Sequence, residues 1–189
     1  GWRALPGPAV ETRLSAEAEA DLARCVGTEG AVFDSDLPHA YSPLFASPAG
    51  DTVIAHVALA PDDSGPRRTI ELLRRAEAPG CWAEVIQSGL IRPGPAEGAP
   101  ADFEYGTLSA VALPYADFGD TTVAWRTSIP VSAGGGGMNL YLDIVVVRVD
   151  RALVTLSFQS QVSPYDRDQS EGVTLILVER VTEAVADSS

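Results

Sequence analysis

Two long, largely apolar runs that meet at a short polar turn dominate the hydrophobic pattern of the chain. They occupy residues 139–161, NLYLDIVVVRVDRALVTLSFQSQ, with the turn at Asp150 and Arg151. Apolar and polar residues alternate over residues 154–159, which is the pattern of a half-buried strand. Residues 144–147 are apolar on both faces, which predicts a strand covered from both sides. The pattern therefore predicts a hairpin at the centre of a sheet.

Further strands are predicted where apolar and polar residues alternate between prolines or glycines. They fall at residues 52–60, 103–113 and 121–130, and two short extended segments lie within residues 30–48. The glycine run at 134–137 is interpreted as a flexible hairpin loop, because a phosphate-binding P-loop needs a lysine and this chain has none.

Apolar residues at helical spacing predict four helices. They cover residues 15–27, 67–77, 80–90 and 169–186. Ser15 is the expected N-cap of the first helix and Gly27 its C-cap. In the second helix Ile70, Leu73 and Arg74 are expected to point inward.

The last predicted helix has either Asp168 or Ser170 as its expected N-cap. Its many β-branched residues lower its helix propensity, so tertiary packing must hold it in place. Its expected buried stripe consists of Val173, Ile176, Leu177, Val181, Ala184 and Val185.

Strands in series between terminal helices predict an α+β fold, a mostly antiparallel twisted sheet with helices packed over it. Residues 1–13 hold two prolines and are expected to be an extended lead-in, and residues 14–186 to form a single domain. A connecting loop rich in proline and glycine is expected at residues 91–102. A chain of 189 residues is long enough for one domain with a substantial core.

The net charge of the chain is -13. A charge of this sign and size argues against non-specific binding to nucleic acid or to anionic membranes. No apolar run approaches the roughly 20 residues that a membrane-spanning helix needs.

Cys25 and Cys81 are the only cysteines, too few for a structural zinc site. Two interpretations remain open on the count alone: two buried free thiols, or one disulfide. Each cysteine falls on the inward side of a helix that is expected to pack on the same sheet, which favours the disulfide.

Catalytic motifs are absent from the sequence. His39 is expected to be solvated in a loop and His56 to be packed or partly exposed on a strand; neither belongs to a G-x-S-x-G triad pattern or an H-E-x-x-H metal site. Acidic residues at 62–63 and 165–168 lack the spacing of a calcium loop and are expected to be solvated turns. We therefore expect no enzymatic activity, no bound metal and no cofactor.

Aromatic residues are scarce, and three of them fall on predicted strands. Trp125, Tyr141 and Tyr105 are candidates for an apolar ligand cleft beneath the helices, with Arg126 or Asp143 at its edge. Ordinary sheet packing is the interpretation that the sequence favours for these residues, and the cleft is the alternative.

The segments DLARCVG, SPLFASPAGDTVIAHVALAP, APGCWAEVI and LYLDIVVVRVDRALVTLSF occur in this order. In these segments the chain resembles a family of small actinobacterial exported proteins and lipoproteins. That family is similar in organisation to the extracellular sensor domain of mycobacterial Ser/Thr kinases and to envelope lipoproteins with a Mog1/PsbP-like fold. The resemblance implies a fold of this kind with a disulfide between Cys25 and Cys81. The AGGGGMN loop and the turn at Asp150 and Arg151 depart from the family, whose members more often have glycine in the turn.

The resemblance also implies a function. It indicates a non-enzymatic extracytoplasmic binding or sensor domain, either secreted or attached to the cell envelope through an N-terminal lipid anchor outside this sequence. The expected partner is a small apolar or neutral envelope ligand or another protein, not nucleic acid, and the membrane is reached only through that anchor. The alternatives are an envelope hydrolase with a cryptic site and a structural subunit of a larger assembly.

Overall fold

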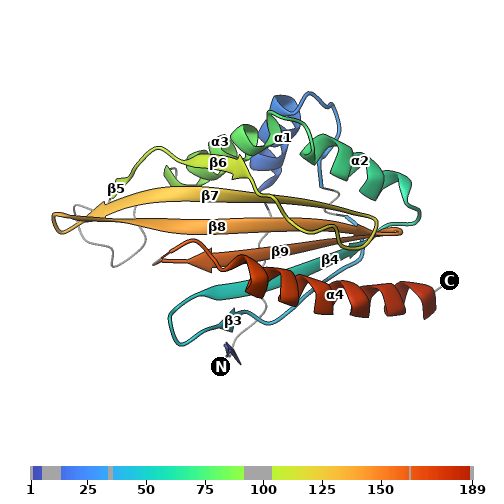
Figure 1. Cartoon of the computed structure of the whole chain (residues 1–189). Coiled ribbons are helices and arrows are strands. Elements are labelled where there is room, and N and C mark those ends of the chain that lie inside the picture. The colour runs from blue at the N-terminus through green and yellow to red at the C-terminus, as the bar shows by residue number, and fades with distance from the viewer. Residues whose placement is uncertain (1, 6–13, 34–35, 92–103, 162, 188–189) are drawn as a thin grey trace.

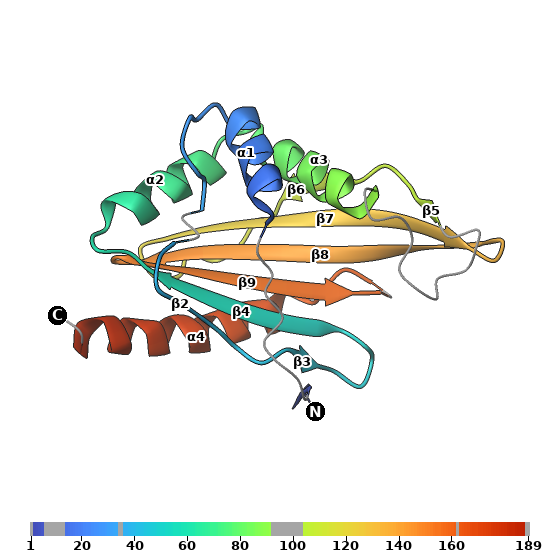
Figure 2. The ribbon, with the colours of Figure 1, turned by 180° about the vertical axis from the view of Figure 1, so that it is seen from behind.

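A computed structural model describes residues 2–5, 14–33, 36–91, 104–161 and 163–187. It shows an α+β fold, as the sequence predicts. The fold has three layers: α1, α2 and α3 lie on one face of a twisted sheet, and α4 lies on the other (Figures 1 and 2). The elements in chain order are β1 (Arg3–Ala4), α1 (Ala16–Cys25), β2 (His39–Tyr41), β3 (Phe45–Ala46), β4 (Thr52–Leu59), α2 (Ser64–Leu73), α3 (Ala78–Ile91), β5 (Glu104–Tyr105), β6 (Ser109–Ala112), β7 (Thr121–Ala133), β8 (Gly136–Val149), β9 (Ala152–Ser160) and α4 (Arg167–Asp187).

The described residues form one sheet of nine strands, and every strand pair in it is antiparallel. Its path runs β1-β3-β4-β9-β8-β7-β5, with β2 paired to β4 and β6 paired to β7. The predicted hairpin is β8 and β9, and it lies in the middle of this order. Its turn is at Asp150 and Arg151, and Asp150 adopts a positive φ of 53°.

The middle of β8 is buried on both faces, which confirms that it is a central strand. Ile144 and Val146 pack into the core beneath α1, α2 and α3, whereas Val145 and Val147 pack into the core against α4. The four residues are at most 5% exposed. This explains why the run at 144–147 shows no alternation, since each side chain has an apolar layer to enter.

The first helix has the predicted N-cap, and its C-cap is Val26, one residue before the predicted Gly27. The side chain of Ser15 accepts a hydrogen bond from the backbone N–H of Ala18, 3.2 Å away. At the other end Gly27 adopts a φ of 72°, and the N–H groups of Gly27 and Thr28 reach back to the carbonyls of Arg24 and Ala23. This is a Schellman-type C-cap, in which glycine takes the left-handed conformation without a steric penalty.

A disulfide joins Cys25, at the end of α1, to Cys81, in the first turn of α3. This confirms the disulfide interpretation and rules out two free thiols. The link fixes two helices that cover the same face of the sheet, and the residues between them in sequence include β2, β3, β4 and α2.

Several helix and strand boundaries differ from the predictions. The second helix spans Ser64–Leu73, and Arg74, expected to point inward, is exposed at its C-cap; Ile70 and Leu73 are buried as predicted. The strand predicted at 103–113 is two short strands, β5 and β6, that both pair with β7. The predicted loop at 91–102 begins at Ile91, which is instead the last residue of α3; the rest of that loop and most of the lead-in at 1–13 lie outside the described residues.

The face that α4 buries also differs from the predicted stripe. Val181 and Val185 are buried as expected, but Ile176 is 54% exposed and Ala184 is exposed. Burial instead continues along Ser170, Thr174 and Val178. The N-cap is Asp166, whose Oδ1 accepts a hydrogen bond from the N–H of Gln169 at 2.9 Å, rather than Asp168 or Ser170.

The glycine run forms the tip of the β7–β8 hairpin. Gly134 and Gly135 are the turn, with φ of 59° and 77°, whereas Gly136 and Gly137 already pair with β7 as part of β8. The hairpin prediction is therefore confirmed, with a tip shorter than the whole run. A positive φ at two successive residues favours glycine there.

Candidate ligand-binding site

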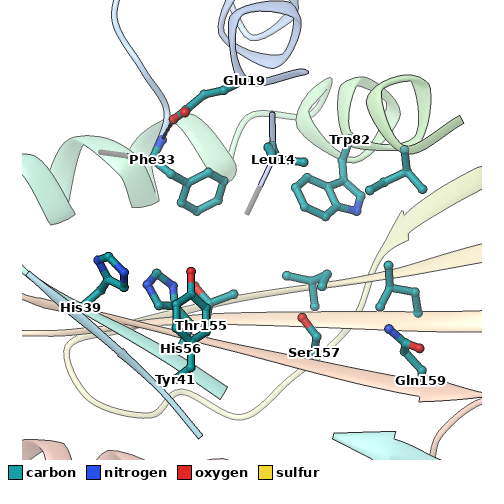
Figure 3. Close-up of a pocket in the computed structure, with 13 residues that line it drawn as sticks. Leu14, Glu19, Phe33, His39, Tyr41, His56, Trp82, Thr155, Ser157 and Gln159 are labelled. Carbon is teal, nitrogen blue, oxygen red and sulfur yellow. Dashed lines mark hydrogen bonds between the residues drawn. The ribbon is translucent and has the colours of Figure 1, made fainter. Parts of the chain in front are cut away.

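A cavity of about 290 Å³ lies between the sheet and the helices α1 and α3 (Figure 3). Its walls come from α1, α3, the segment after α1, and the strands β2, β4, β8 and β9. Ligand pockets in proteins are typically about 300–1,000 Å³ and mostly apolar, with a few polar groups that orient the ligand. The cavity is close to the lower end of that range, so it suits a small ligand.

The helix side of the cavity is apolar. Trp82 and Ile86 come from successive turns of α3, and Leu14 precedes the N-cap of α1. Phe33 completes this wall, and its backbone N–H donates a hydrogen bond of 3.0 Å to Oε1 of Glu19 on α1. That hydrogen bond ties the segment after α1 back to the helix, so the wall is built from parts that hold one another in place.

The sheet side of the cavity combines a polar row with an apolar one. Thr155, Ser157 and Gln159 project from β9, and Leu142 and Ile144 project from the neighbouring β8. Successive side chains of a strand point to opposite faces, so these three polar residues share one face while Leu156 and Phe158 enter the core against α4. The alternation of residues in β9 predicts a half-buried strand, and in the structure the polar face of this strand lines the cavity.

Three rings gather at one end of the cavity, from β2 and β4. Tyr41 lies directly opposite His56 in the strand register, and their rings stack with centroids 4.7 Å apart and planes 20° apart. His39 meets both rings edge-on, at 5.4 Å from Tyr41 and 5.6 Å from His56. The structure corrects one prediction here: His39 is exposed but lies on a strand, where it contacts other rings and where its Nδ1 is 2.8 Å from the carbonyl oxygen of Leu37.

Charge is sparse around the cavity. Among the described residues that line it, Glu19 is the only carboxylate, and no arginine is present. The one buried polar atom of the lining without a hydrogen-bond partner among the described residues is Nε1 of Trp82. The described residues also include no group of three or more histidine, cysteine, aspartate or glutamate residues that could hold a metal ion. The cavity is therefore a weakly polar site with an unused hydrogen-bond donor.

The structure divides the five residues predicted from the sequence between the two faces of the sheet. Trp125 is 3% exposed under α3, with its ring centroid 6.2 Å from that of Trp82, so it lies behind the cavity wall. Tyr105 packs on the same face, against Val131 and the side of α3. Neither residue lines the cavity.

The other three predicted residues lie on the opposite face, which α4 covers. Arg126 and Asp143 are cross-strand neighbours and form a two-pronged ion pair, with N–O distances of 2.7 and 2.5 Å. Arg126 also donates to the backbone carbonyl of Tyr165, 3.1 Å away, and the hydrogen bond to Asp143 is the main reason its pKa is raised. Tyr141 lies on the same face of β8 as Asp143. The sheet therefore separates this pair from Trp125, and the five residues do not meet in one cleft.

Most residues of the cavity escaped the sequence interpretation. The alternation in the sequence did place Thr155, Ser157 and Gln159 on one face of β9. That pattern could have indicated a binding site, because three polar side chains beneath helices need water or a ligand as hydrogen-bond partners. The ring cluster had no comparable signal, since β2 is only three residues long and its pairing with β4 sets the contact. Trp82 belongs to α3, whereas the aromatic candidates predicted from the sequence all fall on strands.

Comparisons with known proteins find little. No family model matches the chain, and no curated protein matches it. Among solved structures, the crystal structure of LpqN, involved in cell envelope biogenesis of Mycobacterium tuberculosis, matches at 17% identity over 78% of each chain with a TM-score of 0.31. A likeness at this level does not establish a shared function. Among the described residues, no helix combines the length and the hydropathy of a membrane-spanning segment.

Proposed function

We propose that this chain is an exported, non-enzymatic domain that binds a small, largely apolar ligand in the cavity between α1, α3 and the sheet. The observation that carries the proposal is the cavity itself. It has an apolar wall of Leu14, Phe33, Trp82 and Ile86 facing a row of polar side chains, the combination that small-molecule sites use.

The disulfide supports the exported location. Structural disulfides form and persist in oxidising compartments, and reducing cytosols keep such thiols reduced. The Cys25–Cys81 bond joins the two helices that roof the cavity. A protein that relies on this bond to hold its binding site is suited to a compartment outside the cytoplasm.

The alternative of a hydrolase has one observation in its favour. His39 and His56 line the same cavity as the hydroxyl groups of Thr155 and Ser157. A catalytic triad also needs a carboxylate that orients the histidine. The only carboxylate of the described lining, Glu19, accepts a hydrogen bond from the backbone of Phe33, across the cavity on the helix side (Figure 3). We therefore favour binding over catalysis.

Binding is tested by titrating the purified chain with N-phenyl-1-naphthylamine, a neutral dye that fluoresces in apolar sites. The wild type is expected to show saturable binding of one dye per chain. Leu142→Trp places a larger side chain into the cavity from β8 and should weaken binding at least tenfold. Met138→Trp is the matched control, because it adds the same ring on the same face of β8 at a position that is 47% exposed and outside the cavity.

Equal binding by the wild type and the Leu142→Trp variant, with both folded by circular dichroism, would show that the dye binds elsewhere. The same preparation is expected to show no turnover of p-nitrophenyl butyrate. Turnover that disappears in the His39→Ala/His56→Ala double variant would favour the hydrolase instead.

A further inference from the structure

Trp82 presents an unused hydrogen-bond donor at the cavity. The residue lies on α3, immediately after the disulfide-bonded Cys81, and is only 8% exposed. Its Nε1 is buried and has no hydrogen-bond partner among the described residues. Figure 3 shows that the indole of Trp82 points from α3 toward the sheet and that Ser157 and Gln159 of β9 lie on the opposite wall.

A buried N–H group without a partner is costly, and most such groups in folded proteins are paired with protein atoms or ordered water. Nε1 of Trp82 is buried and has no hydrogen-bond partner among the described residues, so no described protein group offsets this cost. The ring nevertheless borders about 290 Å³ of open cavity, which leaves space for it to turn toward an oxygen atom that enters. A ligand with a hydrogen-bond acceptor would satisfy the donor.

The opposite wall reinforces this preference. The side chains of Thr155, Ser157 and Gln159 make no hydrogen bond to another described residue, so they too are available to a ligand. Hydroxyl and amide groups both donate and accept, whereas the indole N–H only donates. A ligand between Trp82 and the polar row of β9 therefore meets neutral hydrogen-bonding groups on both sides.

The charges disfavour one class of ligand. Carboxylates and phosphates are recognised by arginine or lysine, and the described lining has neither. The chain as a whole carries a net charge of -13, which repels anions. A neutral acceptor, such as the carbonyl oxygen of a ketone, ester or amide, fits the site better than an anionic one.

We propose that the site selects neutral ligands that combine an apolar body with a carbonyl-type oxygen, and that Trp82 Nε1 donates the hydrogen bond that recognises this oxygen. The inference rests on the proposed function, because it assumes that the cavity binds a small molecule. In this arrangement Trp82 has two roles: its ring supplies apolar contact, and its N–H supplies selectivity.

A pair of dyes tests the selectivity. Prodan is a neutral naphthalene with a ketone carbonyl, and N-phenyl-1-naphthylamine is a neutral naphthalene without one. Trp82→Phe keeps an aromatic ring but removes the N–H. Loss of one hydrogen bond should weaken Prodan binding by about 2- to 12-fold relative to the other dye. Trp125→Phe is the control, since Trp125 is buried behind the wall and does not line the cavity.

A second measurement is made on the wild-type protein, and a variant serves only to assign one signal. In a ¹⁵N-labelled sample the indole N–H signal of Trp82 should move downfield when Prodan is added and move less with the carbonyl-free dye. The signal of Trp2, which is 39% exposed and outside the cavity, should stay in place. Trp82→Phe identifies the Trp82 signal.

The outcomes separate the two proposals. If neither dye binds, or if Leu142→Trp binds both as the wild type does, the proposed function fails. If both dyes bind in the cavity but Trp82→Phe weakens them equally and the indole signal of Trp82 responds to both alike, the carbonyl selectivity is wrong. In that case the N–H of Trp82 does not recognise the ligand.

Discussion

Replacing Cys25 and Cys81 together by alanine removes the link between α1 and α3, and we expect a large loss of stability. The two cysteines are 56 residues apart in sequence, so the disulfide closes a long loop in the unfolded chain. The chain-entropy relation gives a stabilisation of about 4 kcal/mol for a loop of this length. For a chain of 189 residues, this corresponds to a melting temperature lower by about 10 °C.

Thermal unfolding followed by far-ultraviolet circular dichroism measures this loss, and reduced wild-type protein is the control. The double variant and the reduced protein should melt at similar temperatures, because both lack the same cross-link. The helix side of the cavity is also expected to become less rigid, because the disulfide joins the two helices that form it. Glu19 lies on α1, Leu14 precedes α1, and Trp82 lies on α3. Dye binding should therefore weaken in the variant at temperatures where it is still folded.

A melting temperature within 2 °C of the wild type would refute the reasoning about the closed loop. Unchanged dye affinity in a clearly destabilised variant would show instead that the sheet and the local packing hold the roof without the disulfide. The two measurements thus separate the contribution of the bond to the unfolded state from its contribution to the binding site.

Tyr165→Phe is expected to raise the free energy of unfolding by about 1 kcal/mol, measured by urea titration at pH 7. The reason is that the Tyr165 hydroxyl is buried without a hydrogen-bond partner among the described residues. A loss of stability would contradict this. Burial raises the pKa of Tyr165 to about 12 in the folded state. The stability linked to this shift is therefore fully present below about pH 10, the unfolded pKa, and is lost as the pH rises through 12. The Phe variant should lack this loss of stability at alkaline pH. Asp143→Asn should cost about 3 kcal/mol by the same titrations, because it leaves the largely buried guanidinium of Arg126 without its counter-ion. The double variant Arg126→Met/Asp143→Leu should recover most of that loss, and failure to recover it would show that the pair itself is needed.

The sequence determined the parts of the fold that depend on local periodicity. The hairpin of β8 and β9 followed from the alternation of residues 154–159 and the apolar run at 144–147, because a strand's side chains point alternately to its two faces. The limits of α1 followed from Ser15 and Gly27, because a cap is a local interaction between a side chain or a left-handed residue and the helix end. These signals involve residues close in sequence, so they can be read without knowing the fold.

The buried face of α4 shows where such reading fails. Apolar and β-branched residues are spread around this helix, so the stripe predicted from the pattern was only one of several possible buried faces. The structure buries Ser170 and Thr174, whose hydroxyls donate to the carbonyls of Arg167 and Ser170 within the helix, and exposes Ile176. A hydroxyl satisfied by its own helix is buried at little cost, so polarity at these positions was a poor guide to burial.

The candidate site was decided by tertiary structure. The sequence indicated that a ligand would lie between the sheet and the helices, but the residues it favoured fall on both faces, because Trp125 and Arg126 are consecutive on β7 and so point in opposite directions. The observed cavity combines β9, α3 and the three-residue strand β2, which are far apart in the chain. Strand register sets His56 beside Tyr41, and the packing of α3 sets Trp82 over the polar face of β9. Such contacts arise from the free energy of packing the whole chain, and no local pattern encodes them.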